Sequence, residues 1–325
     1  MNSVEKIKKL NGPIFVFGSG GFIGSNLLHS LSSYRDDVYG IVRNETNRWR
    51  LKKLDISEEK ILIADILDKD ALKIIFKKYS PKTIFNLSAY GSSSSQKDYN
   101  LIYKINLIGT ANLIESSPEK SIFINAGSSS EYGYNSSNSS ENKNLKPNSH
   151  YSVSKIASSY LAKFYANSSN RLILNLRLYS IYGQFEDPNR LIPQLVENAR
   201  KKTLPQLVSK NISRDFVFID DCIDAFIQAA LSLNTKISGN SYNVCSGKMT
   251  TIEDIVTKIS DLYSISEKPK WGSMNNRSWD LENWYGDPGN TLNDLGWSAK
   301  NSIEDGIKKC FKWQEQISYE DLKNR

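Results

Sequence analysis

Short apolar runs alternate with amphipathic stretches through the first half of the chain. Apolar runs rich in β-branched residues are typical of buried strands, and longer amphipathic stretches are typical of helices. In order, the segments are IFVFG 14–18, FIGSNLLHSL 22–31, DVYGIV 37–42, KILIAD 60–65, DALKIIFKKY 70–79, KTIFNLSA 82–89, NLIYKINLIGTANLIES 100–116 and KSIFINAG 120–127. Strands that are apolar throughout and alternate with helices predict a parallel sheet covered on both faces. We therefore expect a doubly wound α/β fold.

The second half of the chain has a more mixed pattern. A Ser/Asn-rich segment at 135–149 predicts a surface loop, and RLILNLRLY at 171–179 predicts one more strand. One candidate helix starts near Tyr151, and others lie near 190–202, 219–232, 251–263 and 302–317. We expect residues 1–179 to form one domain and residues 180–325 a smaller mixed α/β domain, with a segment at about 210–245 returning to the first.

The composition is that of an ordinary globular protein, because 39% of the 325 residues are hydrophobic and 24% are charged. No apolar run is long enough to span a membrane, and the charged start MNSVEKIKKL does not predict a secretory signal. Three isolated cysteines, Cys222, Cys245 and Cys310, match neither a disulfide framework nor a metal site and suit a reducing compartment. Two histidines, His29 and His150, are too few for a histidine-based metal site. We expect a cytoplasmic protein without a metal.

The formal net charge of +7 is compatible with nucleic-acid binding, but the distribution of the charges is not. The lysines are scattered and often lie beside acidic residues, as in EKIKK and DKDALKIIFKK, and no stripe of Arg and Lys alternates with aromatic residues. We expect neither a nucleic-acid nor a membrane partner. An enzyme that handles phosphorylated substrates accounts for the basic excess equally well.

Three glycines, Gly18, Gly21 and Gly24, follow the first predicted strand and open the first predicted helix in FVFGSGGFIGSNLL. In this context one glycine permits a tight turn and another lets the backbone approach a pyrophosphate. The first helical residues, Phe22 and Ile23, would present free N–H groups to the anion. The pattern predicts a dinucleotide site.

Two other strand ends contribute to this site. Asp65 and Ile66 follow the strand KILIAD, where the Asp65 carboxylate would accept from an adenine amino group or, alternatively, cap the helix that begins near Asp68. The second strand ends at Val42 and is followed by Arg43, where a carboxylate would be expected to hold the ribose hydroxyls of NAD. An arginine there suits a 2′-phosphate, so NADP is favoured over NAD.

The segment SHYSVSK places Tyr151 four residues before Lys155. Residues at this spacing lie side by side on a helix, so a phenol and an ammonium can touch. They are either a chemical pair or two residues that merely share a helix face, and the spacing alone does not distinguish the two.

Taken together, the motifs resemble those of the extended short-chain dehydrogenase/reductase family, in particular its nucleotide-sugar epimerases and dehydratases. The resemblance covers nearly the whole chain and rests on the order and spacing of the motifs. They are GxxGxxG at 18–24, Asp65, NLIGT at 106–110, GSSSEYG at 127–133, YxxxK at 151–155, RLYSIYG at 177–183, SRDFVFIDD at 213–221, YNVCSG at 242–247 and NRSWDLENWYGDP at 276–288. The resemblance implies that the first domain is a Rossmann domain that binds the dinucleotide.

The resemblance implies a catalytic role for Ser128, Tyr151 and Lys155. Tyr151 would take a proton from a sugar hydroxyl, since an ammonium and an oxidised nicotinamide both favour the phenolate. Lys155 would lower the phenol pKa and hold the nicotinamide ribose, and Ser128 would bond the reacting oxygen. Asn106 would steady the helix that carries the tyrosine, next to the cofactor, or would simply kink its own helix.

The same resemblance implies substrate contacts further along the chain. Arg214 and Arg277 match arginines that grip a nucleotide diphosphate, for which forked guanidinium donors are well suited. Alternatively, they form ion pairs with neighbours such as Asp215 or Asp280. Arg190, in PNRLIP, would lie beside the nucleotide.

The sugar end departs from the family pattern in two places. Ser180 stands where the family carries an asparagine, although Ser128, Ser129 and Ser180 would still face the sugar. The 4,6-dehydratases of the family carry an Asp–Glu pair where Ser129 and Ser130 stand here. Glu131 is displaced by one residue, which on an extended segment turns it to the other side. We therefore expect no dehydratase activity.

The leading hypothesis is an NAD(P)-dependent epimerase that oxidises C4 of a nucleotide-diphosphate sugar and returns the hydride to the other face of the keto sugar. One alternative is an NADPH-dependent reductase of a nucleotide-linked 4-keto sugar, which Arg43 favours. Another is a non-catalytic NADP-binding regulator, which the complete Ser–Tyr–Lys set argues against.

The resemblance also implies a homodimer. The helix near 100–116 and the helix from Tyr151 would pack against their symmetry mates as a four-helix bundle. Candidates for the outward apolar face, which could equally pack against the sheet, are Leu101, Ile105, Leu113, Ile156 and Tyr160.

Overall fold

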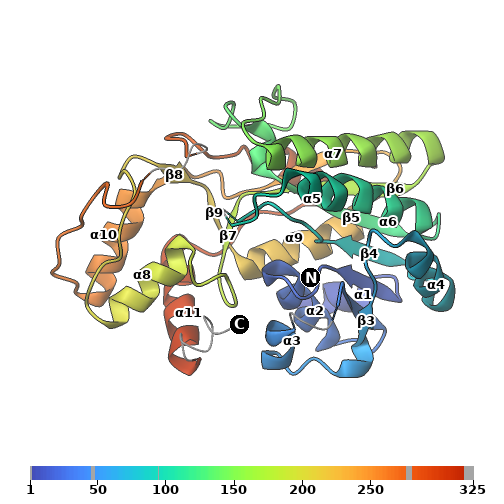
Figure 1. Cartoon of the computed structure of the whole chain (residues 1–325), viewed down its shortest axis with the longest axis horizontal. Helices are drawn as coiled ribbons and strands as arrows, with labels where there is room; N and C mark the ends of the chain where they lie inside the picture. Colours follow the sequence, from blue (N-terminus) through green and yellow to red (C-terminus); the bar gives the residue numbers. More distant parts are fainter. Residues whose placement is uncertain (1, 45–47, 94, 276–279, 318–325) are drawn as a thin grey trace.

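The computed structural model describes residues 2–44, 48–93, 95–275 and 280–317. In this part of the chain seven parallel strands form one sheet, in the spatial order β10-β6-β5-β4-β1-β2-β3 (Figure 1). The strands are β1 (Ile14–Phe17), β2 (Val38–Val42), β3 (Ile61–Ile63), β4 (Thr83–Asn86), β5 (Ile122–Ser128), β6 (Leu172–Leu178) and β10 (Ser241–Val244). The expected doubly wound α/β fold is confirmed.

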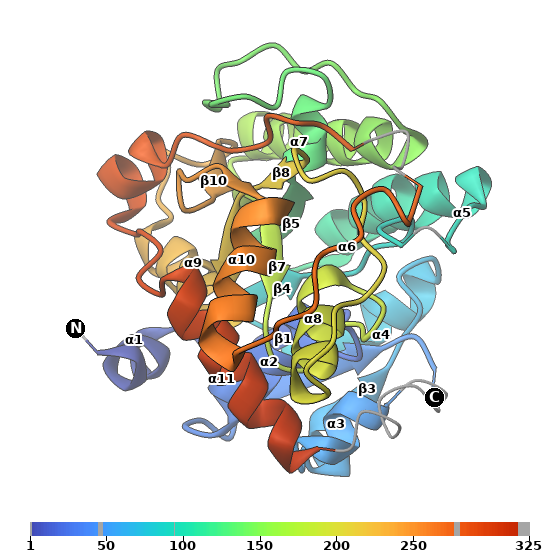
Figure 2. The ribbon, with the colours of Figure 1, turned by 90° about the vertical axis from the view of Figure 1, so that its left-hand side faces the viewer.

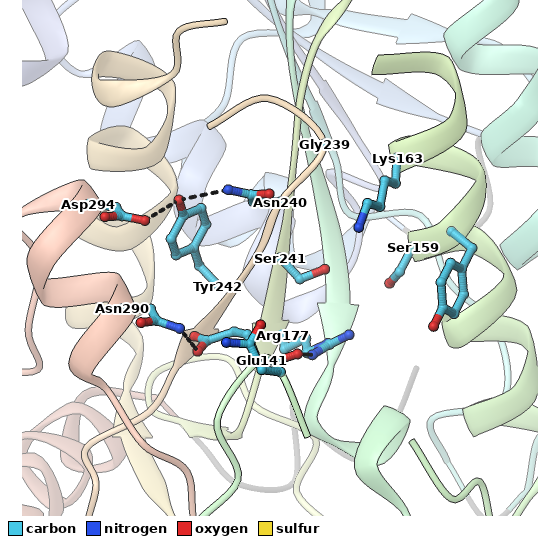
Figure 3. A pocket seen from close by; sticks show the side chains of 12 residues that line it. Glu141, Ser159, Lys163, Arg177, Gly239, Asn240, Ser241, Tyr242, Asn290 and Asp294 are labelled. Carbon is cyan, nitrogen blue, oxygen red and sulfur yellow. Dashed lines mark hydrogen bonds between the residues drawn. The ribbon is translucent and has the colours of Figure 1, made fainter. Parts of the chain in front are cut away.

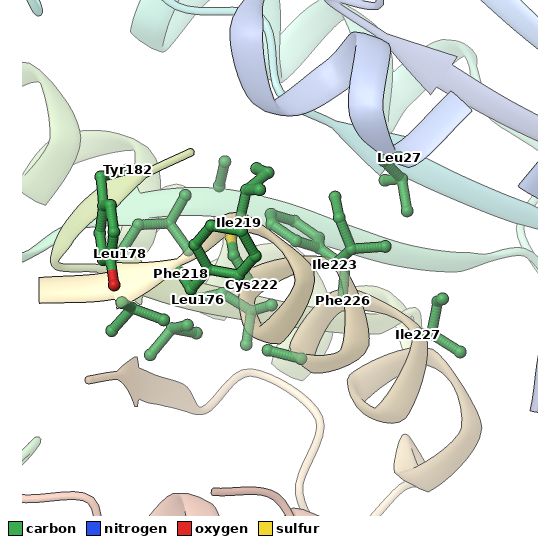
Figure 4. Close-up of a cluster of buried hydrophobic side chains, with 14 of the residues drawn as sticks. Leu27, Leu176, Leu178, Tyr182, Phe218, Ile219, Cys222, Ile223, Phe226 and Ile227 are labelled. Carbon is green, nitrogen blue, oxygen red and sulfur yellow. The ribbon is translucent and has the colours of Figure 1, made fainter. Parts of the chain in front are cut away.

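Helices cover both faces of this sheet. Successive side chains of a strand point to opposite faces, so Ile14 and Val16 of β1 enter one core while Phe15 and Phe17 enter the other. The first core lies under α1 (Ser3–Lys9), α2 (Phe22–Ser32) and α9 (Ile219–Ser232). Figure 4 shows Phe226 and Ile223 of α9 packed towards the sheet residue Leu176.

The second face carries the helices that hold the predicted catalytic pair. They are α4 (Lys69–Tyr79), α5 (Tyr99–Tyr103), α6 (Thr110–Ser116) and α7 (His150–Ser169). The stretch expected as one helix at 100–116 contains a π-helical segment, η2 (Lys104–Gly109), between α5 and α6. Ile105 and Leu113 are buried against the sheet, so these two candidates for an outward dimer face are wrong.

The remaining elements form a second body beside the sheet (Figure 2). Here α8 (Leu191–Arg200) packs against α10 (Ile252–Tyr263) and α11 (Ile303–Gln316), close to where these helices were expected. Short strand pairs join this body to the sheet edge: β7 (Ser180–Tyr182) with β9 (Phe216–Phe218), and β8 (Ser213–Arg214) with β11 (Thr250–Thr251). The smaller segments are α3 (Trp49–Lys53), η1 (Glu58–Lys60), η3 (Ser129–Tyr132) and η4 (Thr291–Leu295).

The Ser/Asn-rich segment at 135–149 is not simply a surface loop. Ser136 and Ser139 are buried, because the Ser136 hydroxyl donates to the carbonyl of Asn283 and the Ser139 N–H donates to that of Tyr285. Serine suits these positions since a short side chain can satisfy a neighbouring backbone group. The segment is thus held down by residues 283–287.

The three cysteines are free and buried, as expected for a chain without a disulfide framework. Burial raises the pKa of the thiols of Cys222, Cys245 and Cys310. Among the described residues, no helix has both the length and the apolar composition that a membrane span requires.

A ladder of asparagines joins the neighbouring strands β4, β5 and β6. Asn86, Asn125 and Asn175 stand level on β4, β5 and β6. The Asn86 amide donates to Asn125 Oδ1 at 2.9 Å, and the Asn125 amide donates to Asn175 Oδ1 at 2.9 Å. All three side chains are buried, so each amide depends on its neighbour for hydrogen bonds.

We predict that Asn125→Ala lowers the free energy of unfolding by about 2 to 4 kcal/mol, because it leaves a buried donor and a buried acceptor unpaired. Urea denaturation followed by circular dichroism measures this loss. Asn112→Ala, which removes a single partly buried bond to the Ile66 carbonyl, serves as the control and should cost about 1 kcal/mol. A loss below that of the control would show that the ladder does not stabilise the sheet.

Candidate active site

The glycine-rich turn between β1 and α2 has the backbone that its sequence predicts. Gly18 has a φ of +74°, and a Cβ on it would lie 2.7 Å from the Leu87 backbone at the end of β4. A Cβ on Gly24 would lie 2.3 Å from the Gly18 carbonyl oxygen. Glycine at both positions therefore lets helix, turn and neighbouring strand come together.

The start of α2 fits a phosphate group. Gly21 caps the helix without a side-chain hydrogen bond, and the first intrahelical bond runs from Ser25 N to the Gly21 carbonyl. The N–H groups of Phe22 and Ile23 precede that bond, and helix N-termini of this kind bind anions. A Cβ on Gly21 would meet only the Gly18 oxygen, at 3.2 Å, so the outer side of the turn is open. These features fit the pyrophosphate of a dinucleotide.

The carboxyl ends of β2 and β3 lie next to this turn. Asp65 is half-buried and accepts from Leu67 N with one oxygen, whereas Asp68 caps α4. Capping of α4, the alternative considered for Asp65, is thus the role of Asp68. Ile66 is buried, and a Cβ on Gly109 would clash with its side chain at 2.4 Å.

Arg43 is exposed directly after β2. The two arginines that follow it in sequence are used within the protein. Arg48 forms an ion pair with Glu58 at 2.7 Å, and the buried Arg50 donates to the carbonyls of Phe185 and Gly20. The basic group that this segment offers to a ligand is therefore Arg43.

Ser128, Tyr151 and Lys155 come together at the carboxyl edge of the sheet. Ser128 ends β5, Tyr151 lies in the first turn of α7, and the two are close enough for Ser128 to lower the phenol pKa by hydrogen bonding. The Lys155 ammonium lies 5.8 Å from the centre of the Tyr151 ring and donates to the Ala126 carbonyl at 2.7 Å. A Cβ on Gly91 would lie 3.2 Å from the Tyr151 ring, so the loop after β4 borders the same site.

Burial opposes ionisation of both members of the pair. It raises the pKa of Tyr151 to about 12, an effect that the bond from Ser128 and the charge of Arg190 reduce and the charge of Glu131 increases. Burial lowers the pKa of Lys155 to about 8, and Glu131 acts in the opposite direction. In the ligand-free chain the phenol therefore keeps its proton at neutral pH, and the ammonium is charged.

The Ser128 hydroxyl is oriented by Ser130. Both the N–H and the hydroxyl of Ser130 donate to Ser128 Oγ, at 3.2 Å and 2.8 Å. A hydroxyl oxygen has two acceptor sites and one proton, so Ser128 is left to act as a donor. The next hydroxyl, of Ser129, is buried and accepts from Trp284 Nε1 at 3.1 Å.

Glu131 does not lie on an extended segment, because residues 129–132 form the short 3₁₀-helix η3. The prediction that an extended backbone turns Glu131 away from the sugar is therefore wrong in its reason. Its carboxylate instead turns into the protein, where it accepts from Ser128 N, from the Ser159 hydroxyl and from Arg177. Glu131 is fully buried by these contacts.

Asn106 lies in the π-helical segment η2 and is buried. Its amide donates to the Tyr90 carbonyl and to the Ser154 hydroxyl, each at 2.8 Å, and its oxygen accepts from Tyr90 N. Asn106 thus joins the loop after β4 to α7 next to Lys155. It therefore lies in a helix irregularity and bonds the helix that carries Tyr151.

The predicted substrate arginines have different surroundings. Arg190 is exposed at the start of α8, donates to the Ser92 carbonyl and lies close enough to Tyr151 to affect its pKa. Arg214 forms an ion pair with Asp280, as in the alternative reading, and stacks over the Trp284 ring at 4.6 Å. Arg277 lies outside the described residues.

Ser180 opens β7, and its N–H donates to the Asp215 carbonyl at 2.9 Å. The Asp215 carboxylate is itself buried and accepts from Ser246, Gly247 and Gly286. The Asp215 carboxylate therefore holds together the loops on this side of the sheet.

The model of the NAD dependent epimerase/dehydratase family matches residues 14–245. The chain belongs to this family. It is 26% identical over 311 residues to a UDP-glucose 4-epimerase of Mycolicibacterium smegmatis, covering 92% of this chain and 97% of the relative. A solved UDP-glucuronic acid 4-epimerase of Bacillus cereus, in complex with UDP-glucuronic acid and NAD, is 25% identical with a TM-score of 0.81 and covers 94% of this chain and 99% of its own.

A third relative is longer than this chain. It is the trifunctional UDP-glucose 4,6-dehydratase/UDP-4-keto-6-deoxy-D-glucose 3,5-epimerase/UDP-4-keto-L-rhamnose-reductase of Arabidopsis thaliana, 24% identical over 317 residues. The match covers 93% of this chain and 47% of the relative, so the chain spans about half the length of that protein.

For a member of the NAD dependent epimerase/dehydratase family, the residues that sequence reasoning missed are those that support Ser128 from behind. Ser130 and Arg177 lie within motifs of the family, but neither those motifs nor the position of Ser159 on its helix indicates that they bond Ser128 and Glu131. The one available signal is the acidic Glu131 beside a predicted catalytic serine, since a carboxylate at such a position needs a partner when buried.

Proposed function

We propose that the chain is an NAD(P)-dependent 4-epimerase of a nucleotide-diphosphate sugar. The observation that carries the proposal is the meeting of Ser128, Tyr151 and Lys155 at the sheet edge. The loop after β4 connects them with the glycine turn, because Gly18 packs against Leu87 and Gly91 borders Tyr151. A proton acceptor and a dinucleotide site thus share one edge of the sheet.

The chain's own residues supply proton transfer and orientation. The Ser128 hydroxyl donates to the reacting sugar oxygen, and the Tyr151 phenol exchanges the proton with that oxygen. A bound nicotinamide would supply the hydride acceptor and donor for C4, and its positive charge in the oxidised form would favour the phenolate. Lys155, held against the Ala126 carbonyl, adds a charge beside the phenol and a donor for the nicotinamide ribose.

Epimerisation asks for no further acid or base. After C4 is oxidised, the keto sugar turns over, and Tyr151 gives its proton back to the oxygen of the inverted carbon. Elimination of water would need an additional acid and base next to Ser128. The side chains there are Ser129, which is held by Trp284, and Ser130, which holds Ser128, while Glu131 is occupied by three donors. We therefore propose that the chain is not a 4,6-dehydratase.

The nucleotide diphosphate would lie between the sheet edge and the second body. Arg190 and Arg214 lie on that side, and Arg277 follows from the resemblance to the family; guanidinium groups bind diphosphates in a forked geometry. We assign residues 1–179 to the dinucleotide-binding domain and residues 180–325 to the substrate domain. The segment at about 210–245 returns from the substrate domain to the dinucleotide-binding domain. A substrate phosphate that took the place of Asp280 beside Arg214 would leave this arginine ion-paired.

A reductase of a nucleotide-linked 4-keto sugar is the second candidate. The exposed Arg43 favours it, because a reductant that is consumed and exchanged is usually NADPH, and an arginine suits the 2′-phosphate. A non-catalytic NADP-binding regulator would have no need for the oriented Ser128 hydroxyl. We infer a cytoplasmic location, since three free thiols suit a reducing compartment.

We also propose a homodimer through α5, η2 and α7, which pack side by side (Figure 1). Val153, Tyr160 and Phe164 form an apolar stripe along α7 with exposed fractions of 40%, 61% and 60%, and Ile108 on η2 is 50% exposed. Exposed apolar stripes on adjacent helices are typical of helix-bundle interfaces. The expected Tyr160 belongs to this stripe, and Phe164 replaces the buried candidates.

The proposed reaction predicts that purified protein inverts C4 of a UDP-, dTDP- or GDP-hexose without changing its mass. Tyr151→Phe should reduce the rate at least about 100-fold with cofactor affinity nearly unchanged, because it removes a proton donor and little packing. Tyr165→Phe, on the outer end of the same helix, is the matched control and should keep the rate. Mass spectrometry measures the mass of the product, and NMR of the sugar measures the configuration at C4.

Each contrary product has one meaning. A product lighter by one water would make the chain a dehydratase, and a keto sugar that gains two hydrogens would make it the reductase. Near-normal turnover by Tyr151→Phe would contradict the assigned mechanism.

The surroundings of Arg43 predict tighter binding of NADP than of NAD by about tenfold, since one charge-assisted contact to the 2′-phosphate is worth about 1.5 to 3 kcal/mol. Arg43→Ala should remove the preference, and Arg43→Asp should reverse it by offering a carboxylate to the ribose hydroxyls. Calorimetric titration with each cofactor measures the affinities. Equal NADP affinities of the wild type and the Arg43→Ala variant would contradict the predicted preference.

The proposed interface predicts a particle of about twice the 36.8 kDa chain mass in light scattering at micromolar concentration. Replacing Tyr160 and Phe164 together by Arg should give the monomer, because it buries like charges against their symmetry mates. Tyr34→Arg, at a similarly exposed aromatic outside the proposed interface, is the control and should leave the dimer intact. A monomeric wild type would rule the dimer out.

A further inference from the structure

One buried carboxylate ties together three elements that surround the catalytic pair. Glu131 on η3 accepts from Ser128 N at 3.0 Å, from the Ser159 hydroxyl at 2.9 Å and from Arg177 Nε at 2.8 Å. These donors belong to β5, α7 and β6. The exposed fraction is 0% for Glu131, 6% for Ser159 and 5% for Arg177, so water does not compete for these bonds.

The three bonds restrict the distance between Ser128 and the helix that carries Tyr151 and Lys155. Ser128 is the last residue of β5, and Ser159 lies one helical turn after Lys155 on α7. The carboxylate therefore spans from the backbone of the catalytic serine to the helix that carries Tyr151 and Lys155. Among the described residues, the bond from Ser159 to Glu131 is the side-chain hydrogen bond that connects α7 with η3.

Arg177 holds the carboxylate from the other side. Its guanidinium donates to Glu131, to the Tyr132 hydroxyl at 3.0 Å and to the Glu141 carbonyl at 3.3 Å. Arg177, Ser159 and Glu141 also line a polar pocket of about 210 Å³ beside β10 (Figure 3). A buried ion pair with this many hydrogen bonds is stable only while both partners are present.

The charges that act on the catalytic pair come from few groups. Lys155 is influenced by Glu131 from η3, and its other neighbours on β5 and α7 are the neutral Ala126 carbonyl and the Tyr151 ring. Tyr151 is influenced by Glu131 and by Arg190 from α8. Arg177 on β6 stands behind Glu131 and bonds its carboxylate directly. Among the residues that the structure describes, Glu131 is the one charged group that acts on both.

We propose that Glu131 is a positioning residue that locks Ser128 to helix α7 and, through its bond to Ser159, places a negative charge one helical turn from Lys155. It touches neither cofactor nor substrate and acts through Ser128 and Lys155. In this chain the acidic residue after the catalytic serine is thus part of the support of the site and not an acid or base of elimination. The inference rests on the proposed function only in taking Tyr151 and Lys155 as the catalytic pair.

The test follows the protonation of Lys155 directly, in the chain without cofactor or substrate. The protein is labelled with ¹³C at lysine Cε, and the Lys155 signal is assigned by its loss in Lys155→Met. Its shift is followed by NMR between about pH 6 and about 11, a range that covers the ordinary lysine pKa of roughly 10.4 and the lower values of buried lysines. In wild type the midpoint should lie near 8. Glu131→Gln, which keeps the shape and removes the charge, should lower the midpoint by about one pH unit.

A second variant covers the case in which Glu131→Gln fails to fold with Arg177 left unpaired. Glu131→Gln/Arg177→Met removes both charges and fills the space with an apolar chain, a replacement that buried ion pairs often tolerate. It should also lower the midpoint, but by less than Glu131→Gln, because the lost positive charge of Arg177 acts in the opposite direction. The control is Asp221→Asn, which alters another buried carboxylate with three hydrogen bonds, to Lys300 N and Asn301, away from the pair. It should leave the midpoint unchanged.

A Lys155 midpoint that stays at the wild-type value in a folded Glu131 variant would overturn the proposal, as would an equal shift in Asp221→Asn. A purely structural role of Glu131 would lower stability in all these variants and move no midpoint. Because no substrate is used, the result does not depend on turnover. Failure of the chain to convert any nucleotide sugar would count against the proposed function alone.

Discussion

Side-chain amides buried between a sheet and its helices have no water to bond, and this constraint sets the strand register on which the site depends. Asn86, Asn125 and Asn175 satisfy one another only when β4, β5 and β6 stand level. A slip of one residue would turn every side chain of a strand to the other face. With the strands held level, Ser128 leaves β5 at the height at which the loop after β4 and the start of α7 meet around Tyr151.

The chemistry of the site follows from a balance between burial and a few charges. Burial alone favours a neutral phenol at Tyr151 and a neutral amine at Lys155. Glu131 counteracts this effect at Lys155, and Arg190 counteracts it at Tyr151. These two charges come from η3 and α8, which lie on opposite sides of the chain's midpoint in sequence. The protonation of the catalytic pair is therefore a property of the assembled fold and not of the YxxxK motif.

The parts that could be predicted from sequence are those with a local physical cause. Apolar runs of strand length, a glycine triplet after a strand and a four-residue spacing on a helix each act within one element. The parts that could not be predicted depend on distant contacts. Leu113 and Phe164 are both apolar helix residues, and only packing decides that the first is buried and the second exposed. Similarly, Glu131 turns inward because Arg177, forty-six positions later, is there to receive it.

The three cysteines show what the two cores imply for reactivity. Oxidants and alkylating reagents attack the thiolate and must reach the sulfur. Cys222 and Cys310 are enclosed in the first core and Cys245 in a separate cluster with Trp284, and burial also keeps all three protonated. The folded chain therefore presents no reactive thiol among its described residues, and its fold is insensitive to the thiol–disulfide balance of its surroundings.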